Sequence, residues 1–150
     1  MNEKEIPPPV NPLTIKLNIT IMRFVSKQFA ARWLPNFDLV VTSDIRTAEH
    51  NKEIGGAANS AHVHGLAEDV VLKNRATGKM LTESEARAVY GEFIAPNWPG
   101  YSEFEKSNAG EGYHIHWNLS REISTYSGLV SMAGIGVIGF ALLNKMQGKA

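Results

Sequence analysis

The sequence predicts an α+β domain, with a small antiparallel sheet and flanking helices, followed by an apolar C-terminal helix. Helical spacing of apolar residues near the N-terminus, short β-branched or alternating runs in the middle, and an uncharged stretch near the C-terminus support this prediction. The 150 residues, 43% of them hydrophobic, suffice for one compact domain and an appendage. We therefore expect an extended proline-rich arm over 1–13, the folded domain over 14–122, an apolar helix over 123–144 and a basic tail over 145–150.

The N-terminal part predicts a helix and then a buried strand. Its apolar residues recur at spacings of three and four: Leu17, Ile21, Phe24, Val25 and Phe29. This spacing places them on one helical face and predicts an amphipathic helix over about 14–33, which Pro35 ends. The run 37–41 is apolar and β-branched, as in a buried strand, and the polar stretch 47–56 predicts a loop or a short helix.

The middle of the chain predicts a second strand, a capped helix and a hairpin. The run 67–72 has the pattern of a strand. Thr82 and Glu85 have the spacing of a capping box, in which each side chain bonds to the other residue's backbone N–H, and they open a predicted helix over about 82–93. Alternating apolar and polar residues on both sides of a turn-rich stretch predict a β-hairpin between residues 101 and 119.

Composition limits the classes of partner. The chain carries 15 basic and 15 acidic residues, so its formal net charge of zero gives no reason to expect a polyanion, and we expect no nucleic-acid partner. Cysteine is absent, so a metal site would have to use histidine and carboxylate ligands. The charged N-terminus, followed by Pro7–Pro9, lacks the apolar core of a secretory signal.

A histidine and an aspartate stand at a spacing that suits a metal site. His62 precedes Asp69 by seven residues, and Gly65 between them can turn the chain sharply because it has no Cβ. An imidazole and a carboxylate brought together in this way are two of the three protein ligands that a catalytic zinc normally takes. The third, a nitrogen ligand, would come from His114 or His116, which share one face of the predicted hairpin strand.

At these residues the chain resembles the zinc D-alanyl-D-alanine carboxypeptidases and their relatives. Those relatives include L-alanyl-D-glutamate endopeptidases, phage endolysins and the amino-terminal domain of hedgehog proteins. The resemblance covers about residues 40–119, and the ten-residue motif, the upstream arginine and the downstream histidine pair occur in the family's order. The residues that carry it are Ser60, His62, Gly65, Ala67 and Asp69, then His114 and His116, and upstream Ser43–Thr47, Asn51 and Gly55–Gly56.

The resemblance implies one Zn²⁺ ion as cofactor, with His62, Asp69 and His116 as its ligands. It also implies that His114 orients or protonates the substrate or the tetrahedral intermediate. A second register stays open: Glu111-x-x-His114 resembles a Glu-x-x-His pattern found in part of the family, which would make His114 the third ligand. We favour His116.

The reaction also needs a base and a group that binds the substrate. Zinc lowers the pKa of its water to about 7, and a carboxylate within hydrogen-bond reach can then take the proton. Glu111, next to the ligand strand, is the leading candidate and Glu105 the reserve, although either could be a solvated hairpin carboxylate. By its position in the family, Arg46 would bond to the scissile carbonyl or to a substrate carboxylate; the alternative is a surface ion pair.

The predicted function is therefore a zinc peptidase whose substrate is a peptide of bacterial peptidoglycan, cut in its stem or at a cross-link. Two other interpretations stay open. One is a zinc-binding module that has lost hydrolysis, as in hedgehog domains. The other is a membrane-anchored structural protein of a virion or envelope. A candidate base, together with His114 and Arg46, favours the enzyme, while the choice between carboxypeptidase and endopeptidase stays open.

The uncharged stretch 123–144 predicts membrane attachment. Its part 128–143 is apolar apart from Ser131, and it is apolar on every side rather than on one face. A spanning helix needs about 20 such residues, so we expect a single-pass C-terminal helix in a lipid bilayer; the alternative is a buried core helix. Such an anchor implies the bacterial cell envelope or a virion membrane as location, virion or envelope proteins as further partners, and a bacteriophage as a suitable source.

Overall fold

A computed structural model of the chain describes residues 11–106 and 112–119. The predicted arm up to residue 10, Glu111, and everything from residue 120 onwards lie outside the described residues, and the predicted membrane helix is among them.

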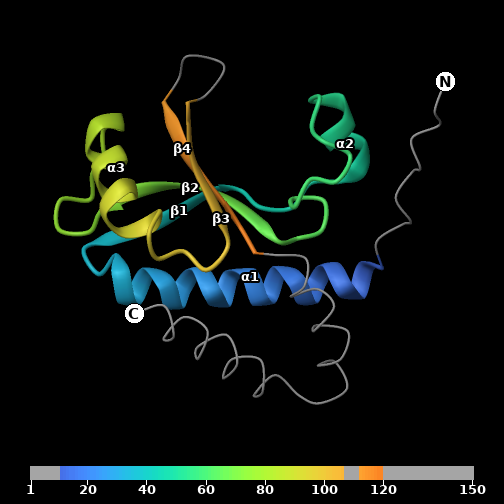
Figure 1. The fold of residues 1–150 in the computed structure, drawn as a ribbon, viewed down its shortest axis with the longest axis horizontal. Helices are drawn as coiled ribbons and strands as arrows, with labels where there is room; N and C mark the ends of the chain where they lie inside the picture. The colour runs from blue at the N-terminus through green and yellow to red at the C-terminus, as the bar shows by residue number, and fades with distance from the viewer. Residues whose placement is uncertain (1–10, 107–111, 120–150) are drawn as a thin grey trace.

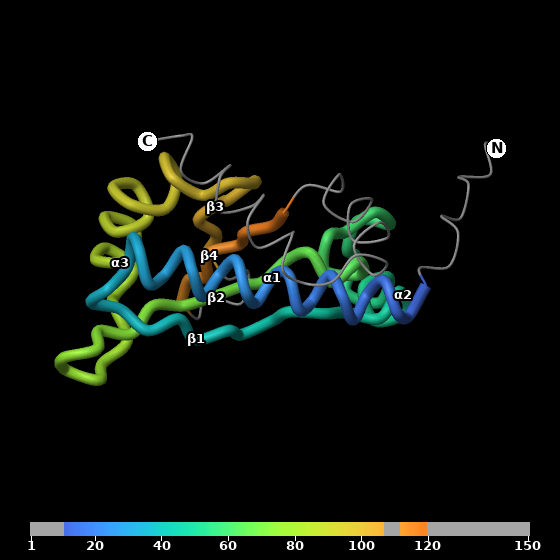
Figure 2. The backbone as a smooth tube through the Cα atoms, turned by 90° about the horizontal axis from the view of Figure 1, so that it is seen from below, coloured from blue at the N-terminus to red at the C-terminus, as the bar shows by residue number. Residues whose placement is uncertain are grey.

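Four antiparallel strands form one sheet in the order β1-β2-β4-β3. A long helix, α1, lies along one face of this sheet, while α2 and α3 lie towards opposite ends of the molecule (Figures 1 and 2). The predicted α+β class, with a small antiparallel sheet and flanking helices, is confirmed. The elements are α1 (Pro12–Trp33), β1 (Phe37–Ser43), α2 (Ala48–Glu53), β2 (Ala67–Asn74), α3 (Glu83–Val89), the π-helix η1 (Tyr90–Ile94), β3 (Tyr101–Lys106) and β4 (Tyr113–Asn118).

Helix α1 forms because its ends are capped and one of its faces is apolar. The Asn11 side chain accepts a hydrogen bond from the Leu13 backbone N–H at 2.9 Å, which satisfies one of the free donors of the first turn. Pro35 cannot continue the helix, and the Leu34 N–H closes the last turn on the Ala30 carbonyl. The buried face consists of Asn18, Ile21, Met22, Val25, Ser26 and Phe29.

The core lies between α1 and the sheet. Trp117 of β4 stacks on Trp98 with ring centroids 4.4 Å apart and meets the Phe29 ring edge-on at 5.8 Å. Since successive side chains of a strand point to opposite faces, burying Trp117 against α1 turns its neighbour His116 to the other face. The same alternation turns Asp69 of β2 away from α1.

The capping box predicted at Thr82 is present, and the helix that follows ends differently from the expectation. Glu85 accepts from the Thr82 N–H at 2.8 Å and its own N–H reaches the Thr82 hydroxyl. The sequence predicts one regular helix to about residue 93, whereas the last turn is a π-helix closed by the Ala95 N–H on the Tyr90 carbonyl at 2.8 Å. The spacing of apolar residues does not distinguish this wider π-helical turn from a regular α-helical turn. At the turn, the Tyr90 hydroxyl donates a hydrogen bond to the Ser102 carbonyl of β3.

In the described ranges, 11–106 and 112–119, no helix has both the length and the apolar character needed to cross a membrane.

Candidate metal centre

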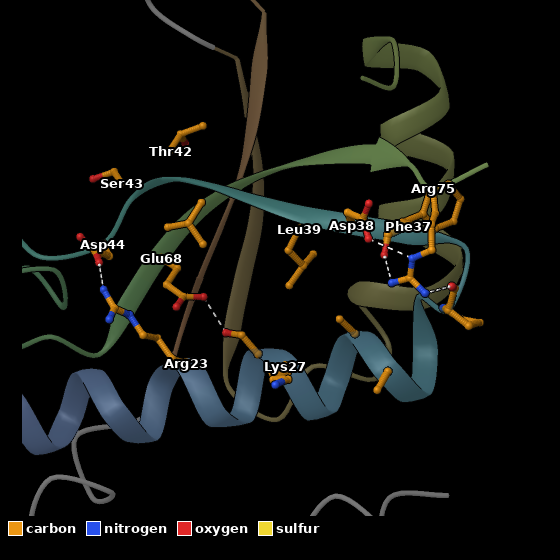
Figure 3. Close-up of a pocket in the computed structure, with 15 residues that line it drawn as sticks. Arg23, Lys27, Phe37, Asp38, Leu39, Thr42, Ser43, Asp44, Glu68 and Arg75 are labelled. Carbon is orange, nitrogen blue, oxygen red and sulfur yellow. Dashed lines mark hydrogen bonds and ion pairs between the residues drawn. The ribbon is translucent and has the colours of Figure 1, made fainter. Parts of the chain in front are cut away.

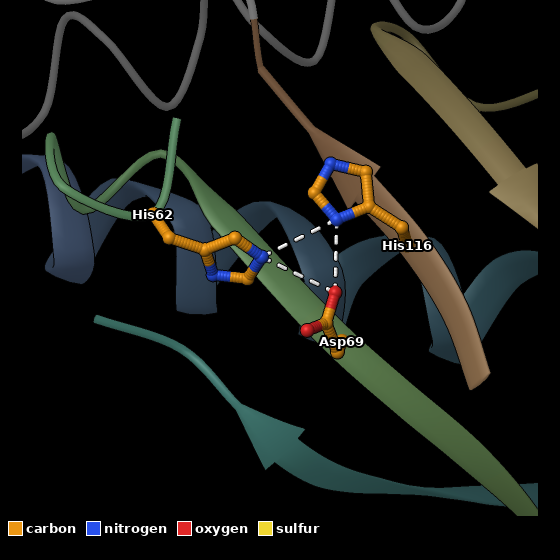
Figure 4. Close-up of side chains that lie close together, drawn as sticks. All are labelled: His62, Asp69 and His116. Carbon is orange, nitrogen blue, oxygen red and sulfur yellow. Dashed lines mark hydrogen bonds and ion pairs between the residues drawn. The ribbon is translucent and has the colours of Figure 1, made fainter. Parts of the chain in front are cut away.

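Three side chains from separate parts of the chain meet on the sheet face opposite α1 (Figure 4). His62 comes from the turn before β2, Asp69 from β2 and His116 from β4. The His62 Nε2 atom lies 3.2 Å from Asp69 Oδ1 and 3.3 Å from His116 Nδ1, and His116 Nδ1 lies 2.8 Å from Asp69 Oδ1. His62 and Asp69 are buried and His116 is partly exposed, so a ligand can approach the three atoms from the His116 side.

The turn that carries His62 depends on the glycine within the sequence motif. Its backbone closes through hydrogen bonds such as that from the Gly65 N–H to the His62 carbonyl at 3.2 Å. Gly65 has a φ of 68°, and a Cβ at this position would stand 2.9 Å from Ile19 Cγ1 and 3.0 Å from the Ile15 carbonyl oxygen of α1. Both the left-handed backbone and the close approach of α1 therefore require glycine here.

Strand register places the other two ligand candidates side by side. Asp69 of β2 is directly opposite His116 of β4 in the antiparallel ladder. Side chains of such a pair share one face, with Cβ atoms about 4.5–5.5 Å apart. The sequence motif supplies Asp69 and the histidine pair separately, and this register selects His116 as the histidine next to Asp69.

The hydrogen bonding of His62 favours a cation between the three atoms. Its Nδ1 lies 2.5 Å from the Asp44 carbonyl oxygen. Because a carbonyl can only accept, Nδ1 carries the proton, and the neutral ring then has a lone pair on Nε2. That lone pair faces the Asp69 carboxylate, another acceptor, so a cation between them satisfies both groups.

The spacing of the three atoms also fits zinc. Tetrahedral zinc with bonds of about 2.0–2.2 Å keeps its ligand atoms about 3.3–3.6 Å apart. The separations of 2.8, 3.2 and 3.3 Å are within about half an ångström of this range. Two imidazole nitrogens and one carboxylate oxygen form a common donor set of catalytic zinc sites, which leave the fourth position free.

Arg46 contacts the second oxygen of Asp69. Its guanidinium donates to Asp69 Oδ2 at 3.0 Å and to the Ser43 hydroxyl at 3.3 Å. Burial raises the pKa of Asp69, but the hydrogen bond from the His116 ring lowers it, and the pKa lies well below the ordinary value. The carboxylate is thus charged, with Oδ2 engaged by Arg46 and Oδ1 directed at the histidines. A contact between Arg46 and a substrate stays a prediction.

The second histidine of the pair has a different partner. His114 Nε2 lies 2.9 Å from Glu105 Oε2, and the two residues are opposite each other in the β3–β4 ladder. Both are partly exposed on the face that carries His116. In the described part of the chain, His114 is not within the possible metal cluster. Glu111, the leading base candidate, is outside the described residues.

Three further residues, which the sequence did not indicate, border the centre. Glu103 is opposite His116 in the ladder, and its carboxylate accepts a hydrogen bond from the Tyr101 hydroxyl. Asn118 Nδ2 lies 3.4 Å from His116 Nε2. The alternation of residues 101–105 shows which of them share a face, but only the hairpin register shows which one faces His116.

Comparison with known proteins identifies the family. The chain matches the model of a family described as Peptidase M15 over residues 10–101, more than half of its length. The matched region contains Arg46, His62 and Asp69 and ends before His116. No curated protein and no solved structure matches the chain. The resemblance inferred from the sequence is confirmed: the chain belongs to the Peptidase M15 family of metallopeptidases, within the superfamily of the zinc D-alanyl-D-alanine carboxypeptidases.

Proposed function

We propose that the protein is a zinc-dependent peptidase that hydrolyses peptide stems or cross-links of bacterial peptidoglycan. The observation that carries the proposal is the convergence of His62, Asp69 and His116 within 4.8 Å in a chain of the Peptidase M15 family. These three residues would hold the zinc ion. When bound, zinc supplies Lewis-acid catalysis and a nucleophilic water at neutral pH.

The residues around the centre prepare it for this task. The Asp44 carbonyl fixes the His62 ring so that Nε2 faces the centre. Arg46 holds Asp69 through one carboxylate oxygen and leaves the other for the centre. Arg46 is partly exposed, with 23% of its side chain accessible, so its other guanidinium N–H groups can also donate to a carbonyl or carboxylate of the peptide.

Proton transfer is assigned to groups on the β3–β4 side. The Glu105 carboxylate holds the His114 ring at Nε2, which leaves Nδ1 of that ring for the substrate. In such a pair, Nε2 of His114 keeps its proton on the Glu105 side, and Nδ1 can deliver a second proton to the nitrogen of the departing peptide. Glu111 remains the first candidate for the general base, with Glu105 as the alternative.

We further propose that residues 123–144 tether the enzyme to a membrane. The support is the sequence alone: 22 positions without a charged residue. A tether keeps a peptidase near an insoluble substrate, so the cell envelope or the membrane of a phage particle would be its place of action.

The test is incubation of the purified, zinc-loaded full chain with purified peptidoglycan, followed by mass spectrometry of the released peptides. We expect new peptide termini at one type of bond, and the bond identifies the enzyme as a carboxypeptidase or an endopeptidase. An Asp69→Asn variant is the control and should release nothing, because it lacks the anionic ligand.

Zinc binding without new termini, under conditions in which a known peptidoglycan peptidase is active, would contradict the peptidase and leave the zinc-binding module as the better interpretation. Release that is equal in the Asp69→Asn variant would show that the centre described here does not catalyse the reaction.

A further inference from the structure

Glu68 is a buried carboxyl group that the proposed reaction does not use. It precedes Asp69 in β2 and is only 2% exposed. Its side chain points from β2 towards α1, on the sheet face opposite the metal centre (Figure 3). Burying a carboxyl group is costly unless hydrogen bonds compensate for the lost water, so a carboxyl retained here requires an explanation.

One oxygen of Glu68 joins three elements. Oε2 accepts from the Ser26 hydroxyl of α1 at 2.6 Å and from the Trp117 indole N–H of β4 at 3.3 Å. Trp117 is the residue directly opposite Glu68 in the ladder. The hydrogen bond therefore crosses from β2 to β4 inside the core.

This cross-strand bond lies immediately behind the ligand pair. Glu68 is opposite Trp117, and the next pair along the ladder is Asp69 with His116. A slip of one residue between these strands would turn His116 into the core and away from Asp69, because side chains alternate between faces. A contact that ties Glu68 to Trp117 therefore also fixes which side chain faces Asp69.

Helix α1 fixes the third ligand candidate as well. The Asn18 side-chain amide donates to the His64 carbonyl at 2.9 Å, within the turn that carries His62. The helix thus bonds to that turn through Asn18 and to the strand pair through Ser26. Both contacts act on the relative position of the three candidate ligands.

We propose that Glu68 is a positioning residue of the metal centre. By accepting from Trp117 and Ser26 it keeps β2 and β4 in the register that holds Asp69 against His116, and it thereby raises the affinity of the centre for a divalent metal. The inference rests on the metal site of the proposed function and needs no peptidase activity.

The role requires an acceptor oxygen at position 68. Glutamine can provide it, since its amide oxygen can accept both hydrogen bonds. Glu68 also lines a groove of about 800 Å³ between α1 and β1, which leaves room for the amide nitrogen of a glutamine (Figure 3). Methionine has a similar length but leaves the indole N–H and the hydroxyl without an acceptor.

The test compares Glu68→Gln and Glu68→Met in the full chain, with Leu72→Met as the matched control. Leu72 is fully buried on the same face of β2, but a leucine side chain makes no hydrogen bond, so its replacement changes the packing and leaves the acceptor at position 68 in place. The zinc dissociation constant is measured by competition with a chromophoric chelator, and the absorption spectrum of the Co²⁺ form reports the ligand geometry. We expect zinc binding about 10–100-fold weaker and a changed cobalt spectrum for Glu68→Met, an effect of the size found when a direct hydrogen-bond partner of a metal ligand is removed. Glu68→Gln and Leu72→Met should resemble the wild type.

Hydrogen exchange of the metal-free protein provides a second readout. Glu68→Met should lower the protection of backbone amides in 67–70 and 115–118, and Glu68→Gln should not. A folded Glu68→Met variant with wild-type zinc affinity and protection would overturn the proposal, as would a Glu68→Gln variant as impaired as Glu68→Met. If Glu68→Met does not fold, Ser26→Ala takes its place, because it removes only a hydroxyl that donates to Glu68.

The two proposals fail in different ways. A wild-type chain that binds zinc but does not cut peptidoglycan contradicts the peptidase and leaves the role of Glu68 intact. A wild-type chain that binds no zinc contradicts the metal centre and with it the affinity role of Glu68, whatever the exchange experiment shows.

Discussion

At the scale of single residues, the centre is determined by the atom that each side chain presents. The Asp44 carbonyl engages Nδ1 of His62, so Nε2 is directed at the other two groups. Arg46 engages one oxygen of Asp69 and leaves the second. His116 presents Nδ1 from a strand 47 residues further along the chain than Asp69. His62 and Asp69 are therefore each oriented by a neighbour before any metal binds, which lowers the cost of assembling the centre.

The ligand set predicts the effect of replacing each histidine of the hairpin. His116→Ala should lose zinc, because it removes the atom closest to Asp69, while His114→Ala should keep zinc and lose activity. Metal analysis of the purified variants, with circular dichroism as the control for folding, measures the difference. Loss of zinc in His114→Ala with retention in His116→Ala would establish the other register.

The choice of general base can be decided by a matched pair of amide substitutions. Glu111→Gln should keep zinc and lower turnover about 10²–10⁴-fold, because the amide retains the shape but cannot accept a proton. Glu105→Gln should have a smaller effect if Glu105 only orients His114, to which it is bonded.

Turnover on peptidoglycan peptides and zinc content are measured in parallel for both variants. Unchanged turnover in Glu111→Gln together with the large loss in Glu105→Gln would transfer the role of base to Glu105.

At the scale of elements, α1 supports the centre from behind. It packs its apolar face on the sheet and contacts the His62 turn so closely that only glycine fits at position 65. The turn, β2 and β4 each provide one ligand candidate, and α1 contacts all three. Displacing α1 from the turn should therefore affect metal binding and stability together.

Gly65→Ala tests this contact, with Gly78→Ala as the matched control. The two glycines have nearly the same positive φ, 68° and 67°, but a Cβ would clash with α1 only at Gly65, because nothing lies within 4 Å at Gly78. Gly78→Ala should cost about 1–2 kcal/mol of unfolding free energy through the left-handed backbone alone. Gly65→Ala should cost more and should also weaken zinc binding.

Urea denaturation of the metal-free variants and zinc titration of the folded proteins give the two quantities. Equal losses of stability, with zinc affinity unchanged in both variants, would show that α1 does not position the turn.

At the scale of the whole molecule, the sheet separates stability from chemistry. One face packs on α1 and contains the stacked tryptophans of the core, and the other carries the partly exposed metal centre. Residues can therefore be exchanged on the open face without disturbing the core. Glu68 links the two faces, because it is buried in the core and its neighbour in the chain, Asp69, is a ligand candidate.

The predicted anchor is tested by truncation. A chain that ends at Glu122 should be soluble and bind zinc, while the full chain should need detergent. The 22 uncharged positions from 123 to 144 would span about 33 Å as a helix, enough for a hydrocarbon core of about 30 Å. Fractionation of cells that express each form measures the difference, and a full chain that stays soluble and monomeric without detergent would refute the anchor.

The sequence by itself determined most of the elements and brought together two of the three ligand candidates. Periodicity and caps predicted α1, the strands and the capping box at Thr82 because these signals are local. The motif also placed His62 near Asp69, since only a tight turn and the start of a strand separate the two residues in the sequence. What a local pattern could not resolve was the π-helical turn at Tyr90, because apolar spacing is similar in both kinds of helix.

The tertiary structure alone decided which groups face one another. The register of β2 against β4 places His116 rather than His114 next to Asp69, and the register of β3 pairs His114 with Glu105. Alternation along a strand shows which residues share a face, but a partner across the sheet depends on how distant strands align. The core contact of Glu68 was beyond sequence reasoning for the same reason: its donors come from elements 42 and 49 residues away.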